Sequence, residues 1–263
     1  MARPLSRDRS GAEPGGAALQ IPLGALVDDA RDDVVRAEVG DRASVWAVVG
    51  DGGAGKTTAL HAIATTLCAL YPPHRVQLAI ADFQNGIGRA GLASGHVAAY
   101  LGRGRAAAPQ ECRDWCAAVE HELDRRITGP VTGEFVVLID PIDEWLDECP
   151  DMGRTVQRVV DEGQHLGVRI IMAWTASWVV WNADRGSFQR SSDTAHGRTL
   201  SAAESDTVLL LRTTTVQESR DVLGKDDAAM IPAERPGVGY LRSLTGVQGP
   251  LRVFKADVLG RAN

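Results

Sequence analysis

A run of glycines, one lysine and two threonines follows a short apolar segment in VVGDGGAGKTTAL, residues 48–60. Glycines have no Cβ, so successive backbone N–H groups can turn toward one anion, and the N-terminus of a following helix favours negative charge. The lysine can reach the β and γ phosphates of a nucleotide, and a threonine hydroxyl suits Mg²⁺, which prefers oxygen ligands. The pattern G-x-x-x-x-G-K-[ST] is complete, which predicts a triphosphate site with Mg²⁺ formed by Gly50, Gly52, Gly53, Ala54, Gly55, Lys56, Thr57 and Thr58.

Such a site also needs an acid at the end of a neighbouring buried strand. The apolar run FVVLID, residues 135–140, ends in Asp140. An aspartate in this place holds the metal ion of P-loop enzymes, so Thr57 and Asp140 are the predicted metal-binding residues. The alternative is that Asp140 only ends its strand and begins a turn with Pro141.

The acid that would activate an attacking water is harder to assign. In many P-loop ATPases a glutamate directly follows the strand-end aspartate, but here that position is Pro141, and the nearest acids are Asp143 and Glu144. We predict Glu144 for this role if the turn after Pro141 directs it toward the γ phosphate; otherwise Asp143 and Glu144 form a solvated charged pair. Because a positioned general base contributes about 10²–10⁴ in rate, a chain without one binds the nucleotide and hydrolyses it slowly.

Two further strand ends carry polar residues. Thr175 and Ser177 follow the run VRIIMAW, and Asp82 ends the run VQLAIAD. Ligands of α/β folds bind at the carboxyl edge of the sheet, so Thr175 could sense the γ phosphate. The alternative for all three residues is an ordinary polar loop or turn. The predicted catalytic set is therefore Lys56, Asp140, Glu144 and Thr175.

Apolar runs and helical patterns alternate along the chain. Runs of this kind are typical of strands buried on both faces, and they occur at residues 45–50, 76–82, 135–140, 168–174 and 207–212. Helical patterns cover residues 57–71, 109–127 and 153–166, and the first of them presents an apolar face of Leu60, Ile63, Leu67 and Leu70. The alternation predicts an α/β fold with a mainly parallel central sheet flanked by helices.

Three segments fall outside this alternation. Residues 183–206 are polar, and we expect a long surface excursion there. The turn-rich ending after residue 231 predicts a short C-terminal hairpin. Residues 1–18 are rich in Gly, Pro, Ala and Arg, which is typical of a flexible leader, so the predicted domain covers residues 19–263.

Composition limits the class of protein. Of 263 residues, 44% are hydrophobic and 24% are charged, which is typical of a globular chain. The net charge of −6 makes nucleic acid an unlikely partner. No apolar stretch approaches the roughly 20 residues that span a bilayer, so we expect membrane contact only through other parts of a complex.

The four cysteines are Cys68, Cys112, Cys116 and Cys149. They are too few and too scattered to indicate a disulfide framework, which predicts a reducing cytoplasm. Cys112 and Cys116 could face a common ligand, but they also continue an apolar helical stripe with Val119 and Leu123. We favour the stripe, because no second pair completes a metal set.

Together these segments resemble the FtsK/SpoIIIE family of RecA-like motor ATPases, most closely the tandem ATPase domains of EccC in type VII secretion. The phosphate loop and FVVLID are similar to the family's Walker A and Walker B motifs. VEHELDRR resembles its Glu-x-x-x-Arg-Arg helix, and RIIMAWTASW resembles the strand that ends in Thr-Ala-Asn-Arg-Trp. The stretch IPLGALVDDARDDVVRAEV resembles its strand-rich beginning, and IPAERPGVGYL its C-terminal Pro-Gly-Arg-Gly element. The likeness covers nearly all of residues 20–257.

The resemblance implies ATP with Mg²⁺, and sibling ATPase domains in a tandem or hexameric assembly. It also implies a small helical secreted protein as substrate and a cytoplasmic place at the inner face of the membrane. Lys56, Thr57, Asp140 and Thr175 carry over as site residues. Ser177 and Val238 depart from the family's Asn and Arg, and with Pro141 they predict a weakly hydrolysing domain.

Two points stay open. Arg89, Arg103, Arg105 and Arg125 are candidates for an arginine that acts on a neighbour's nucleotide, although most surface arginines are only solvated. The alternatives to a secretion ATPase are a DNA-translocating motor of the same family and a regulatory module that binds nucleotide without turnover.

Overall fold

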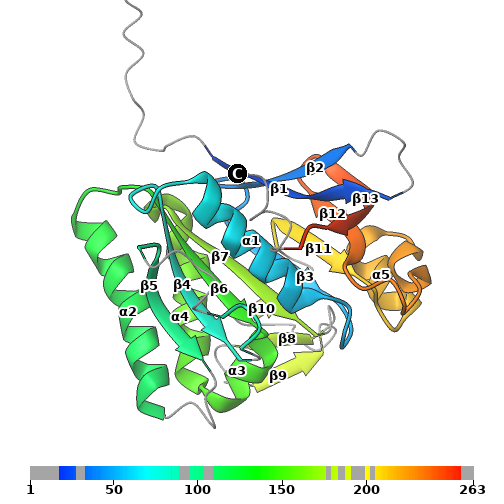
Figure 1. Cartoon of the computed structure of the whole chain (residues 1–263). Coiled ribbons are helices and arrows are strands. Elements are labelled where there is room, and N and C mark those ends of the chain that lie inside the picture. Colours follow the sequence, from blue (N-terminus) through cyan, green and yellow to red (C-terminus); the bar gives the residue numbers. More distant parts are fainter. Residues whose placement is uncertain are drawn as a thin grey trace, which may run out of the picture.

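The computed structural model describes residues 18–27, 33–83, 85–88, 95–102, 109–175, 179–182, 187–190, 199–201 and 205–255. These residues form one ten-stranded sheet with helices on both faces (Figure 1). The strand order is β2-β1-β13-β12-β11-β3-β7-β6-β4-β5. The α/β class that the sequence predicts is confirmed.

The parallel half of the sheet runs from β11 to β5 and consists of the predicted apolar runs with one added edge strand. Its strands are β11 (Thr207–Leu211), β3 (Val45–Val49), β7 (Val168–Trp174), β6 (Glu134–Asp140), β4 (Val76–Asp82) and β5 (Val97–Gly102). Neighbours in this half pair in parallel, so their carboxyl ends share one edge. Along that edge, Asp82 of β4 is in register with Asp140 of β6.

The other half of the sheet is antiparallel. The C-terminal hairpin is β12 (Val238–Ser243) and β13 (Gly246–Val253), and the first two described strands are β1 (Leu19–Leu26) and β2 (Val34–Val39). The hairpin joins the sheet beside β11, and β1 pairs with β13. The predicted hairpin is therefore part of the main sheet, and residues from the two ends of the domain meet there.

Helices cover both faces because alternate strand residues are buried on opposite sides. They are α1 (Lys56–Leu70), α2 (Pro109–Thr128), α3 (Ile142–Glu148), α4 (Pro150–Glu162) with the 3₁₀ turn η1 (Gly163–Leu166), and α5 (Val216–Leu223) with η3 (Asp227–Met230). Ala47 and Val49 of β3 lie in a core with α2, α3 and α4, whereas Trp46 and Val48 lie in a core with α1 and β1. Residues of β3 belong to both cores, so this strand is held from both faces. The loop that follows it therefore starts at the carboxyl edge of the sheet.

Two details differ from the sequence-based expectation. Leu70, the last residue of α1, is 54% exposed, whereas Leu60, Ile63 and Leu67 are buried as predicted.

The expected excursion at 183–206 contains two short strands, β9 (Ser187–Arg190) and β10 (Thr199–Ser201), which pair with β8 (Val179–Asn182) in a separate sheet. Backbone pairing needs no apolar run, so the polar sequence gave no strand signal. Ser205 and Asp206 are also described, and the other residues of this segment lie outside the described part.

The predicted boundary between a leader and a domain stays a prediction, since residues 1–17 lie outside the described residues. The first described strand starts at Leu19. Among the described residues, no helix is long and apolar enough to cross a membrane.

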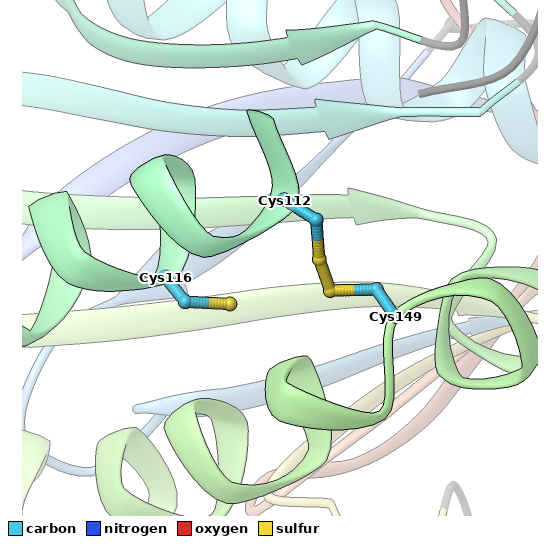
Figure 2. A group of neighbouring side chains, drawn as sticks. All are labelled: Cys112, Cys116 and Cys149. Atoms are coloured by element: carbon cyan, nitrogen blue, oxygen red, sulfur yellow. A yellow bond between two sulfur atoms is a disulfide. The ribbon is translucent and has the colours of Figure 1, made fainter. Parts of the chain in front are cut away.

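The cysteine prediction is wrong in one respect. Cys112 in the first turn of α2 forms a disulfide with Cys149, which lies between α3 and α4, and their Cα atoms are 6.3 Å apart (Figure 2). A pairing 37 residues apart in sequence depends on how α2 packs against α4, at whose N-terminus Cys149 lies, and spacing alone does not reveal this packing. One disulfide is not a framework, and Cys68 and Cys116 are free thiols, so the predicted reducing compartment stays a prediction. Cys116 is a buried free thiol beside the pair, and burial raises its pKa to about 11.

Candidate functional site

The glycine loop lies between β3 and α1 at the carboxyl edge of the sheet. Gly55, the residue before α1, has φ 108°, a conformation that a residue with a Cβ rarely adopts. A Cβ on Gly55 would also lie 2.9 Å from the backbone nitrogen of Gly237. The Gly237 N–H donates to the carbonyl oxygen of Ala54 at 2.8 Å. The residue before the C-terminal hairpin therefore braces the loop directly.

Lys56 turns back into this loop. Its Nζ donates to the carbonyl oxygens of Gly50 at 2.7 Å and Asp51 at 3.0 Å. Burial lowers the pKa of Lys56, while four carboxylates oppose this shift, in the order Asp143, Asp140, Asp51 and Glu144. The ammonium group is thus held at the mouth of the loop among acids, where it can exchange carbonyl partners for phosphate oxygens.

Thr57 and Asp140 come together, as a shared metal site requires. The Thr57 hydroxyl hydrogen-bonds the Asp140 carboxylate, whose side chain is 1% exposed. The second oxygen of that carboxylate, Oδ2, is buried without a hydrogen-bond partner among the described residues. A hydroxyl and a carboxylate oxygen fit Mg²⁺, which commonly binds one or two protein oxygens and keeps several waters. The metal-binding roles of both residues remain predictions.

Burial raises the pKa of Asp140 to about 6, against the hydrogen bond from Thr57, and the nearby charge of Asp82 raises it further. A bound divalent cation would favour the ionised form and reverse this shift. In the free protein, by contrast, the ionised carboxylate destabilises the fold.

Replacing Asp140 with asparagine should therefore stabilise the nucleotide-free protein. The folded pKa of about 6 exceeds the ordinary value of 3.8, so the cost of ionisation is fully present above the folded value and disappears as the pH falls to the ordinary one. At neutral pH the variant should gain up to about 3 kcal/mol in free energy of unfolding. Urea unfolding of both proteins across this pH window measures the difference. A less stable variant at neutral pH would contradict the expected sign.

Asp82 has a structural place at the same edge. Its fully buried carboxylate accepts hydrogen bonds from the backbone N–H groups of Gly86, Ile87 and Gly88 at 3.0, 2.9 and 2.8 Å, and from the Tyr100 hydroxyl at 3.2 Å. These bonds form the turn after β4. Of the two interpretations from the sequence, the geometry favours the turn over a phosphate contact.

That turn also reaches the metal-binding pair. A Cβ on Gly86 would overlap Cγ2 of Thr57, so only glycine lets the turn lie against this methyl group. The contact limits the rotation of the Thr57 side chain, whose hydroxyl bonds Asp140. Sequence reasoning missed Gly86; its only local signal is a glycine four residues after a strand-end aspartate.

The acids of α3 face the site instead of forming a solvated pair. Asp143 and Glu144 lie in the first turn of α3, both are half-buried, and both favour the charged form of Lys56. Glu144 also raises the pKa of Asp140. Which of the two acts on a bound ligand is not decided by their position in the sequence.

The other predicted residues are placed as follows. Thr175 is exposed and follows Trp174, whose carbonyl oxygen accepts the Gly50 N–H at 3.3 Å, so it lies beside the start of the loop. Its sensor role remains a prediction, and Ser177 lies outside the described residues. Trp174 itself is fully buried in the core of the domain.

The candidate arginines reduce to one within the described part of the chain. Arg125 forms an ion pair with Glu122 of the same helix at 2.7 Å. Arg89, Arg103 and Arg105 lie outside the described residues. The ion pair shows that Arg125 already has a partner on its own helix.

A pocket of about 370 Å³ opens beside the first turn of α1. Gly55 and Thr58 line it on the side of the loop, and Phe254 and Lys255, which follow β13, line another side. Its size suits a small ligand, and it directly adjoins the glycine loop. Phe254 and Lys255 therefore place an aromatic ring and a cation next to the glycine loop.

Comparison with known proteins agrees with this architecture. The model of the FtsK/SpoIIIE family matches residues 19–168. The chain is 26% identical over 269 aligned residues to the ESX-4 secretion system protein EccC4 of Mycobacterium tuberculosis, a match that covers 89% of this chain and 20% of that protein. The chain thus spans about a fifth of the length of this curated relative.

Solved structures show the same fold. The cytoplasmic domain of the type VII secretion ATPase EccC of Thermomonospora curvata superposes with a TM-score of 0.62 at 20% identity, over 93% of this chain and 29% of that chain. ATPases 2 and 3 of EssC from Geobacillus thermodenitrificans give 0.63 at 15% identity, over 97% of this chain and 48% of that one. Since the family model matches more than half of its residues, the chain belongs to the FtsK/SpoIIIE family.

Proposed function

We propose that this chain is the ATP-binding, weakly hydrolysing ATPase domain of an EccC-like type VII secretion motor. The observation that carries the proposal is the contact between the Thr57 hydroxyl and the buried Asp140 carboxylate beside Lys56. Asp140 meets there the adjacent residues Lys56 and Thr57, from which it is distant in sequence, and a Mg²⁺-bound triphosphate needs these three residues together.

Each part of the site has a role in this proposal. The amide groups from Gly50 to Thr57 bind the phosphate oxygens, with Lys56 as their counter-charge. Thr57 and Asp140 would hold Mg²⁺, which neutralises charge on the phosphates. The pocket lined by Thr58 and Phe254 takes the base, because it adjoins the loop and offers an aromatic surface for stacking.

In this proposal, the isolated chain turns over slowly mainly because an arginine from a neighbouring subunit is needed at the phosphates. Pro141 carries no acid, and Arg125 is paired on its own helix. An arginine supplied by a neighbouring subunit contributes about 10³–10⁵ in rate in related chemistry. We therefore propose that full activity depends on sibling ATPase domains in a tandem or hexameric assembly.

The relatives support the proposed partners. One solved structure is Thermomonospora curvata EccC (ATPases 2 and 3) in complex with a signal sequence peptide, with a TM-score of 0.55 at 15% identity over 91% of this chain. By analogy, we propose a small helical secreted protein as substrate. We also propose a cytoplasmic location at the inner face of the membrane, through other parts of the assembly.

Calorimetric titration with Mg·ATP tests the proposal. We expect a Kd in the micromolar range or tighter, weaker binding when EDTA removes Mg²⁺, and slow turnover by the isolated chain. Adding the flanking domains should raise turnover. Rapid hydrolysis by a dilute monomer would contradict the proposal, and salt-dependent DNA binding would favour the DNA-translocating alternative.

A further inference from the structure

The first turn of α3 holds an acid with an unusual environment. Asp143 lies three residues after Asp140, and Figure 1 shows α3 below the sheet at the end where β6 stops. Oδ1 of Asp143 is shielded from solvent and has no hydrogen-bond partner among the described residues. A buried carboxylate oxygen without a partner is costly, and such atoms in a cleft often serve a ligand or a water held by one.

The same carboxylate acts electrostatically on Lys56, the lysine of the glycine loop. Four carboxylates favour the charged Lys56, and Asp143 contributes more than Asp140, Asp51 or Glu144. Because attraction falls with distance, this ranking indicates that the Asp143 carboxylate lies in the neighbourhood of the Lys56 ammonium group. Asp143 is thus at the end of the nucleotide where a water would attack.

The other candidates for a base are less well placed. The Asp140 carboxylate accepts the hydrogen bond of the Thr57 hydroxyl and is the predicted metal ligand. A carboxylate that binds the metal ion does not also take the proton of the attacking water. Pro141 has no ionisable side chain. Glu144 is the weakest of the four carboxylates at Lys56. Asp143 is therefore the acid that combines an unpartnered oxygen with a position near the γ phosphate.

We propose that Asp143, and not Glu144, is the general base of this domain; this rests on the proposed ATP hydrolysis. The water oxygen forms a bond to the γ phosphorus while the bond from that phosphorus to the β–γ bridging oxygen breaks. The electron pair of the broken bond leaves with ADP, and the water's proton passes to Asp143 Oδ1. Release of that proton to solvent after phosphate leaves restores the carboxylate.

Two matched variants, Asp143→Asn and Glu144→Gln, test the assignment. Each is compared with the unaltered chain in the Kd for Mg·ATP and in single-turnover hydrolysis. Asp143→Asn should keep the Kd within about threefold and slow hydrolysis by about 10²–10⁴, the usual contribution of a general base. Glu144→Gln should slow hydrolysis clearly less than Asp143→Asn does, because the Glu144 carboxylate is the most weakly coupled to Lys56, so the ratio of the two effects assigns the base.

A second measurement does not depend on turnover. Mg·ADP with aluminium fluoride mimics the γ phosphate under attack by water, so a base that orients the water should strengthen trapping of this complex. Asp143→Asn should weaken trapping at least about tenfold while Mg·ATP binding persists. Trapping and hydrolysis equal to the unaltered chain would overturn the assignment, as would a loss found only in Glu144→Gln.

The outcomes separate this inference from the proposed function. If the unaltered chain does not bind Mg·ATP, the proposed function itself fails. If the chain binds Mg·ATP and Asp143→Asn weakens that binding more than about tenfold, Asp143 holds the nucleotide or its metal, and the role as base is overturned.

Discussion

Lys56→Ala should lose nucleotide binding by at least about a hundredfold and remain folded. The Lys56 ammonium donates to two carbonyl oxygens at the mouth of the loop, and charge-assisted bonds to phosphate oxygens contribute about 1.5–3 kcal/mol each. Loss of two such bonds accounts for the expected change in Kd. Stability should change little, because burial already lowers the pKa of this lysine and so disfavours its charge in the free protein.

Calorimetry and thermal unfolding measure the two effects. Lys225→Ala is the matched control, since Lys225 forms an ion pair with Asp227 on the surface at 2.6 Å and does not line the loop. That variant should bind Mg·ATP like the unaltered chain. A Lys56→Ala protein with unchanged affinity would show that the phosphates bind elsewhere.

Gly55→Ala should damage both stability and binding. Its φ of 108° is strained for a residue with a Cβ, and the added carbon would lie 2.9 Å from the backbone of Gly237. Backbone strain of this kind costs about 1–3 kcal/mol, and the contact adds to it, so we expect a loss of about 3 kcal/mol in free energy of unfolding. The loop would have to shift, which removes the N–H groups from their positions around the phosphates.

Gly52→Ala is the control for Gly55→Ala. A Cβ on Gly52 would meet no atom within 4 Å, and its φ is not in the left-handed region. Urea unfolding should therefore find this variant within about 0.5 kcal/mol of the unaltered chain. Equal losses in both variants would mean that the contact with Gly237 does not shape the loop.

The sequence predicted the parts of the fold that depend on local pattern. Strands such as β3 and β6 are buried on both faces and therefore appear as continuous apolar runs, and α1 begins at Lys56, as the glycine signal indicates. The motifs also led to the FtsK/SpoIIIE family, which the family model confirms. The site residues that belong to a short motif could therefore be predicted from the sequence alone.

What the sequence could not predict depends on contacts between distant segments. Predicting the disulfide between Cys112 and Cys149 requires knowing how α2 packs against α4, at whose N-terminus Cys149 lies. Gly86 is recognisable only from its contact with Thr57, and the short strands β9 and β10 lack an apolar pattern. The choice between Asp143 and Glu144 likewise depends on the direction of α3, which a count of residues after Asp140 does not give.

The hydrogen bond from Gly237 to Ala54 has a consequence for the order in which the protein matures. Ribosomes synthesise the chain from its N-terminus, so Lys56 emerges long before Gly237 does. Until then the nascent loop lacks the brace that Gly237 gives it. If the loop binds ATP as proposed, its braced form becomes available only after Gly237 has been synthesised and the C-terminal hairpin has joined the sheet.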